Sequence, residues 1–119
     1  MTKPDNRQRL QHILEAIAKI QTYLQGFDEE KFRHDEKTLS AVVWQLAVIG
    51  EAVANLTNEL RGENLQIAWS KISGTRNHLI HGYFSIDFDV VWDTTQNDLP
   101  ILKKQIEKIL QVILETESS

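Results

Sequence analysis

The sequence contains no cysteine, five glycines and two prolines. Without cysteine, disulfide bridges, thiolate catalysis and cysteine-ligated metal sites are excluded. A cysteine-free chain suits a reducing compartment, and we expect a cytoplasmic protein. Because few glycines and prolines interrupt the chain, we also expect long helices.

An excess of positive charge is absent as well. Lys and Arg total 13 against 17 Asp and Glu, which gives a formal net charge of -4. Extended, nonspecific nucleic-acid binding usually needs a broad basic surface, so any RNA contact must come from a local positive site. No apolar run approaches the roughly 20 residues of a membrane span, and the N-terminus lacks the apolar core of a signal peptide. We therefore expect no membrane association.

Apolar residues recur at steps of three and four along most of the chain, which is typical of amphipathic helices. The 119 residues are enough for one core, so we expect a single domain over residues 1–119. The fold class is all-α, an up-down bundle of four main helices with one possible short extra helix in the polar run "DEEKFRHDEK". The main helices are expected at Asp5–Gln25, Asp35–Arg61, Leu65–Ile80 and a last stretch from about Val91 to Ile113.

Single residues mark some of the helix ends. Asp35 is a candidate N-cap of the second helix and Gly62 a candidate stop. Pro100 either kinks the last helix or starts its second part, because proline in a helix interior removes a backbone hydrogen bond.

The long second helix carries two apolar stripes, and the second includes Trp44, Val48 and, at the same spacing, Glu51. A helix that is apolar on two faces is either central in its own bundle or shared with a partner subunit. In so small a domain we favour a partner, and a homodimer is the simplest one.

The run "SGTRNHLIHGYF" places Arg76 in a slot of the apolar stripe of the third helix. An unpaired buried guanidinium is costly, so Arg76 must be paired or face a shared, partly solvated cleft. Glu51 is a plausible partner. The structural interpretation of these two residues is a buried Arg–Glu ion pair that joins two helices.

His81 adds a chemical interpretation. On an ideal helix it points about 140° away from Arg76, so one straight helix cannot aim both at one atom. Either the helix ends at His81, or a second subunit completes the site. An arginine that binds phosphate and a histidine that moves a proton suit RNA cleavage through the 2′-hydroxyl, without a metal. No Asp, Glu or His grouping has the spacing of a metal site.

The pattern of arginine, four residues, histidine, one residue and tyrosine resembles the signature of the HEPN superfamily, in particular its HepT-like toxins. The match extends to "IGEA" at 49–52, Trp69, "RNHLIHGYF" at 76–84, "VVW" and "DLPIL". It covers most of the chain from about Val42 to Leu110.

The resemblance implies a homodimer whose paired motifs form a ribonuclease cleft. Arg76 and His81 would be catalytic, with Asn77 and Glu51 in support. It also implies a minimal nucleotidyltransferase antitoxin that transfers AMP from ATP to Tyr83, and RNA as the substrate, with no cofactor. Two alternatives stay open: a non-catalytic subunit that binds a nucleotide or the nucleotidyltransferase, and a dimeric scaffold in which Arg76 is structural.

Overall fold

The computed structural model describes residues 5–81 and 87–118, with the backbone alone for residues 76–81 and 118. All secondary structure within these ranges is helical, which confirms the all-α class. Four long helices form the bundle and shorter ones join them, so the possible extra helix after the first one is present as α2. The long helices are α1 (Asn6–Tyr23), α3 (Glu36–Ala54), α5 (Trp69–His81) and α7 (Leu99–Ser118), and the short ones are α2 (Glu29–Arg33), α4 (Asn58–Gly62) and α6 (Phe88–Asp93).

Helix α1 lies close to its predicted bounds, with a capping box at its start and a left-handed glycine shortly after its end. The Asp5 side chain accepts from the Gln8 backbone N–H, and the Gln8 side chain accepts from the Asp5 backbone N–H, which makes a capping box. Beyond the helix, Gly26 has a φ of 77°, a left-handed conformation that glycine adopts at no steric cost. The predicted apolar face is buried through Leu10, Ile13, Ile17 and Ile20.

The predicted second helix is wrong at its C-terminal end, because it divides into α3 and α4. The Asp35 side chain caps α3 by accepting from the Thr38 backbone N–H, as predicted. After Ala54, however, the Asn55 side chain donates to the Glu51 carbonyl, and Thr57 caps α4. Thr57 also exchanges two hydrogen bonds with Asn6 of α1. These side-chain bonds to the backbone compete with a continuous helix, and they fasten the break to α1.

The third helix begins later than predicted. Helix α5 starts at Trp69, and Leu65, expected on the apolar stripe, is 80% exposed. Ile67 is buried in its place. The Trp69 indole N–H donates to the carbonyls of Arg61 and Asn64, so this buried ring fixes the turn between α4 and α5.

The last helical stretch is continuous but not uniform. A π-helical turn at Thr94–Asp98 joins α6 to α7, and Pro100 lies in the first turn of α7. A proline ring clashes with the carbonyl four residues before it in a regular α-helix, and we attribute the wider turn to that clash. Pro100 therefore starts the second part of the stretch, one of the two predicted outcomes. The predicted stripe of α7 is buried through Leu102, Ile106 and Ile109.

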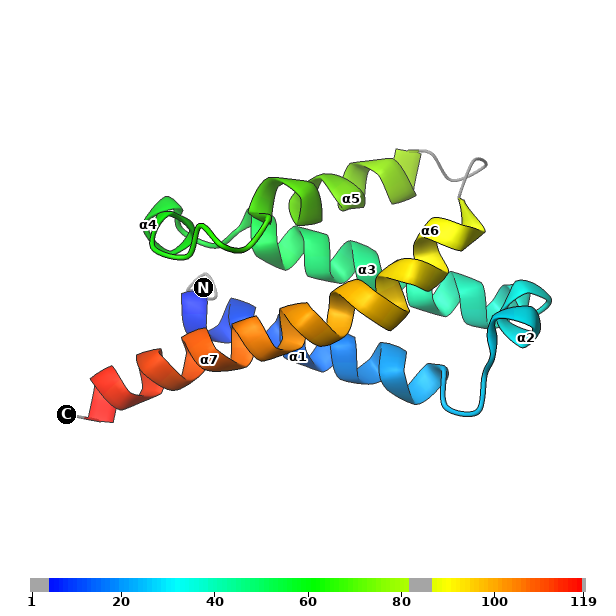
Figure 1. The fold of residues 1–119 in the computed structure, drawn as a ribbon. Coiled ribbons are helices and arrows are strands. Elements are labelled where there is room, and N and C mark those ends of the chain that lie inside the picture. The colour runs from blue at the N-terminus through cyan, green and yellow to red at the C-terminus, as the bar shows by residue number, and fades with distance from the viewer. Residues whose placement is uncertain (1–4, 82–86, 119) are drawn as a thin grey trace.

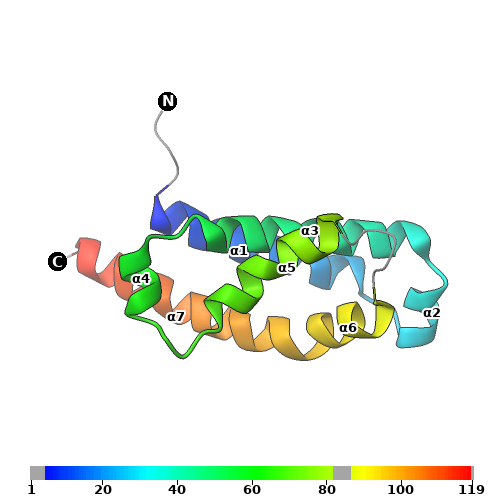
Figure 2. The same ribbon diagram turned by 90° about the horizontal axis from the view of Figure 1, so that it is seen from above.

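The helices form two layers, with α3 and α5 in one and α1 and α7 in the other (Figures 1 and 2). Helix α3 packs most extensively against α5 and α1. By length and composition alone, α3 is also apolar enough to cross a membrane, a test that core helices pass too. The packing of α3 leaves α5, the helix with the Arg76–His81 run, along one side of the bundle.

Candidate functional site

The predicted site residues lie on two neighbouring helices. Arg76, Asn77 and His81 belong to α5, and His81 is its last residue. Both ways of bringing Arg76 and His81 to one atom, an end of the helix at His81 and a second subunit, stay predictions. The side chains of these three residues lie outside the described part of the chain, and so does Tyr83, so their roles stay predictions.

Glu51 lies on α3, the helix that packs against α5. Its side chain is exposed, and its Oε1 accepts a hydrogen bond of 3.1 Å from the Asn55 side chain. The Asn55 amide also donates to the Glu51 carbonyl, at 2.8 Å. Glu51 lies on the side of α3 that also carries Trp44, because seven residues, about two helical turns, separate them. The Glu51–Arg76 pair itself stays a prediction.

The exposure of Trp44 and Val48 shows how far the second apolar stripe of α3 is covered by its own chain. Trp44 is 66% exposed and Val48 is partly buried. Ala52 of the same stripe is buried within the chain's own core. The second stripe is therefore only partly covered by its own domain, as a partner-facing surface would be. Homodimerisation itself is not tested by the single chain.

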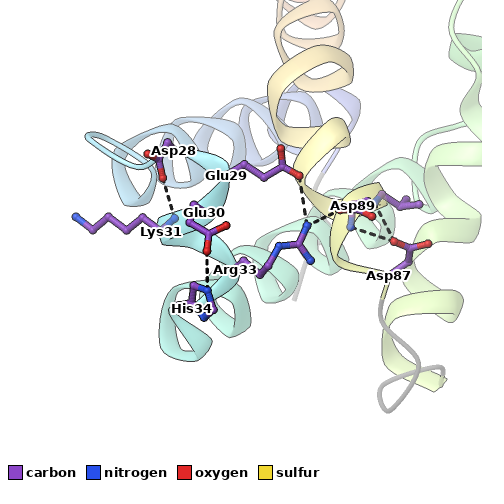
Figure 3. A network of polar contacts seen from close by, with 9 residues as sticks. Asp28, Glu29, Glu30, Lys31, Arg33, His34, Asp87 and Asp89 are labelled. Carbon is purple, nitrogen blue, oxygen red and sulfur yellow. Dashed lines mark hydrogen bonds and ion pairs between the residues drawn. The ribbon is translucent and has the colours of Figure 1, made fainter.

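A polar network fixes the element that follows residues 82–86 (Figure 3). Helix α6 begins after Asp87, whose side chain accepts from the backbone N–H groups of Asp89 and Val90. The Arg33 guanidinium of α2 lies 2.8 Å from Asp89 and 3.4 Å from Glu29. It also lies over the Phe88 ring, 4.3 Å from its centroid. Helix α2 therefore anchors the start of α6.

An aromatic cluster lies beneath this network. Phe32 of α2 is fully buried, and its ring centroid lies 5.1 Å from that of Phe88 and 5.3 Å from that of Trp92. The Arg33 and Asp89 side chains above it are 43% and 73% exposed. The buried ring and the exposed ion pair join the same two helices, but they differ greatly in their burial.

We expect Phe32→Ala to lower the free energy of unfolding by about 3–5 kcal/mol, because it removes a buried ring and leaves a cavity. Arg33→Gln is expected to cost about 1 kcal/mol or less, since exposed ion pairs contribute little. Equilibrium unfolding in urea measures both. Similar losses for the two variants would contradict this division between core and surface.

Lys31, Arg33 and Lys37 are the basic residues of the run "DEEKFRHDEK", and such residues could line a path for RNA. In the structure Arg33 is paired with two carboxylates, and the Lys31 ammonium lies 4.4 Å from the centroid of the Phe27 ring. A groove of about 520 Å³ runs between α5, α6 and α7. Its lining is mainly aliphatic, with Lys71 as its basic side chain.

Within residues 5–81 and 87–118, as far as their side chains are described, no group of three or more His, Asp or Glu could hold a metal ion.

Comparisons with known proteins agree with the motif. A model of the family described as ribonuclease HepT-like matches residues 13–109. A candidate RNase from Caldanaerobacter subterraneus subsp. tengcongensis is 37% identical over 105 residues, 88% of this chain and 94% of the relative. A probable ribonuclease HepT from Thermococcus cleftensis is 36% identical over 107 residues, 90% of this chain and 97% of the relative. A candidate RNase from Methanocaldococcus jannaschii is 37% identical over 113 residues, 95% and 93% of the two chains. No solved structure matches the chain.

Proposed function

Because the chain belongs to the HepT-like ribonuclease family, we propose that it is a metal-independent endoribonuclease toxin of a toxin–antitoxin pair. The observation that carries the proposal is the motif of Arg76 and His81, which lie on α5, and Tyr83, which follows in the sequence. It combines an anion binder, a proton-transfer group and a nucleophilic hydroxyl that can be modified.

The proposed reaction is an attack of a ribose 2′-oxygen on the adjacent phosphorus. His81 takes the proton of the 2′-hydroxyl, the new P–O bond forms, and the bond from phosphorus to the 5′-oxygen breaks. The products are a 2′,3′-cyclic phosphate end and a 5′-hydroxyl end that receives a proton. Arg76 binds two phosphate oxygens through its planar fork and offsets the charge that develops in the transition state. Asn77, one turn before His81, is the group that orients the imidazole.

A homodimer completes the proposed site. On one continuous helix, positions 76 and 81 are about 140° apart, so the two groups from one chain do not face one atom. Two copies related by a two-fold axis would place two arginines and two histidines in one cleft. The exposed part of the second apolar stripe of α3, where Trp44 is 66% exposed, supports this proposal, because a second copy of the chain could cover it.

Control of the toxin is proposed to act at Tyr83. A minimal nucleotidyltransferase antitoxin would transfer AMP, with the Tyr83 oxygen attacking the α-phosphate of ATP and pyrophosphate leaving. The attached phosphate would then occupy the anion site at Arg76 and exclude RNA. In the sequence Tyr83 lies two positions after His81 and four positions before Asp87, the N-cap of α6.

A non-catalytic subunit that binds a nucleotide or the nucleotidyltransferase is the second candidate. The net charge of -4 favours it, because nucleases usually carry positive charge near their RNA. This candidate predicts complex formation that does not need His81.

Substitution of Arg76 tests the proposal against the scaffold alternative. We expect Arg76→Ala to lower the cleavage rate by about 10²–10³-fold, as the loss of one group that stabilises transition-state charge does. Arg76→Lys should recover part of the rate, because it keeps the charge and loses the fork. Cleavage assays and thermal melting of both variants make the measurement. Full activity of Arg76→Ala, with a large drop in its melting temperature, would show that Arg76 has only a structural role.

A further inference from the structure

One side of the helical bundle is open. Helix α5 packs extensively against α3, but within residues 5–81 and 87–118 it makes only sparse contacts with α6 and α7. Figure 2 shows it running obliquely across the bundle, with α3 on one side of it and α6 and α7 on the other. The groove of about 520 Å³ lies on this open side. Since packed helices lie about 8–10 Å apart, the groove marks the place where α5 lacks a helical neighbour.

The groove has an aliphatic floor and exposed aliphatic side chains at its rim. The floor is formed by buried side chains of α3, α6 and α7, which are Leu46, Ile49, Val91, Leu99 and Leu102. At the rim, Val90 of α6 is 58% exposed and Ile101 of α7 is 60% exposed. Exposed aliphatic side chains around an apolar hollow are typical of a surface that a protein partner covers.

Two opposite charges lie on opposite walls of this groove. Lys71 belongs to α5, and Asp98 ends the π-helical turn before α7. Both side chains are exposed, and among the described side chains no ion pair includes either of them. A partner that carries an acidic group toward Lys71 and a basic group toward Asp98 would pair with both, which would fix its direction in the groove.

The groove lies on the opposite side of α3 from the proposed dimer surface. That surface contains Trp44, which precedes the floor residues Leu46 and Ile49 by two and five positions. At about 100° per residue, these two residues point about 160° and 140° away from Trp44. A second copy of the chain on the Trp44 side therefore leaves the groove open, and the groove is available to a different protein.

The groove also lies close to the connection that contains the proposed modification site. Its walls include α5 and α6, and residues 82–86 join these helices in the sequence. At about 1.5 Å per residue, Thr75 lies about 9 Å along α5 from His81, and Val90 about 4.5 Å along α6 from Asp87. A protein seated between these walls is thus close to both ends of the connection, and Tyr83 belongs to that connection.

We propose that this groove is the docking site for one amphipathic helix of the nucleotidyltransferase antitoxin. The aliphatic face of that helix fills the groove, and its flanking charges pair with Lys71 and Asp98. Docking here holds the enzyme near Tyr83 and leaves the proposed dimer surface free. The described lining residues include no aromatic ring on which a base could stack, so the groove suits a protein better than single-stranded RNA. The proposal rests on the proposed function and adds a partner surface outside the motif.

The experiment measures docking separately from AMP transfer. The probe is the minimal nucleotidyltransferase encoded next to the gene of this chain, and its affinity for the full-length chain is measured by calorimetry without ATP. We expect Ile101→Asp to weaken binding by at least about tenfold, because it places a charge against the apolar face of the partner. Ile101→Leu should bind within about twofold of wild type. Lys71→Glu should weaken binding about fivefold, because it replaces an attraction by a repulsion.

The matched control is Val112→Asp, which adds the same charge to the same helix, at a position that is 57% exposed and outside the groove. It should bind within about twofold of wild type. With ATP present, Ile101→Asp should raise the KM of AMP transfer to this chain about tenfold and leave kcat within about twofold, because it removes binding remote from the reacting atoms. Thermal melting of each variant checks that the fold is kept.

Two results would overturn the docking site and leave the modification of Tyr83 standing: equal affinities for Ile101→Asp and Val112→Asp, or AMP transfer to Ile101→Asp with the KM of wild type. Absence of any binding to the wild-type chain would overturn it as well. So would a lower mass in sedimentation for Ile101→Asp than for wild type, because the groove would then hold a second copy. Groove-dependent binding without AMP transfer would support the docking site and remove only the proposed modification.

Discussion

Replacing His81 with alanine is expected to lower the rate of RNA cleavage by about 10²–10⁴-fold, the usual contribution of a general acid–base group. The imidazole is the group that removes the proton of the 2′-hydroxyl, and alanine leaves no replacement at the end of α5. Because His81 is the last residue of α5, its loss should change the melting temperature little. Initial rates on one labelled RNA, together with thermal melting, make the measurement.

His78 supplies a matched control, since it lies on the same helix, within the variable positions between Arg76 and His81. His78→Ala should cleave within a few-fold of wild type. An unchanged rate for His81→Ala would remove the proposed mechanism. The non-catalytic alternative would then be preferred if complex formation with the nucleotidyltransferase survived.

The second large effect is expected for Tyr83→Phe when the nucleotidyltransferase antitoxin is present. Phenylalanine lacks the oxygen that attacks ATP, so no AMP can be attached at this position. Cells that express both proteins should stop growing with Tyr83→Phe and grow normally with wild type. Intact mass should show added AMP units on the wild-type chain only.

RNA cleavage by purified, unmodified Tyr83→Phe controls for a direct role of the hydroxyl. A rate within a few-fold of wild type is expected, because the proposed chemistry uses Arg76 and His81. Attachment of AMP to the Tyr83→Phe chain would contradict the assignment of the modified residue. Neutralisation without any modification would indicate that the antitoxin acts by binding.

The helices were predictable where local signals and apolar periodicity agreed. Asp5 and Asp35 cap α1 and α3 as their side-chain chemistry suggests, and Pro100 opens α7. The break after Ala54 was not predictable from periodicity, because Leu56 within the break and Leu60 after it continue the apolar stripe into the core. The bonds between Asn6 and Thr57 that fasten the break join residues 51 positions apart.

The candidate site was predictable only in part. The third helix was expected to reach about Ile80, and α5 includes both Arg76 and His81. The roles of the two side chains stay predictions. A groove of about 310 Å³ between α1 and α3, lined by Trp44, Arg9 and His12, could not be found in the same way, because it needs these two helices packed side by side. Arg9 and His12 are ordinary polar positions of α1 in the sequence. Their shared surface with Trp44 is a product of tertiary structure.

The most direct test of the central claim is cleavage of one RNA in the presence of EDTA, with intact mass confirming that Tyr83 is unmodified. The comparison strand has the same sequence with a single 2′-deoxy nucleotide at the mapped cut. The account predicts that the RNA is cut to a 2′,3′-cyclic phosphate end and that the substituted strand is not cut at that position. Cleavage of both strands at this position, or loss of all cleavage in EDTA, would contradict a 2′-hydroxyl-dependent, metal-independent ribonuclease.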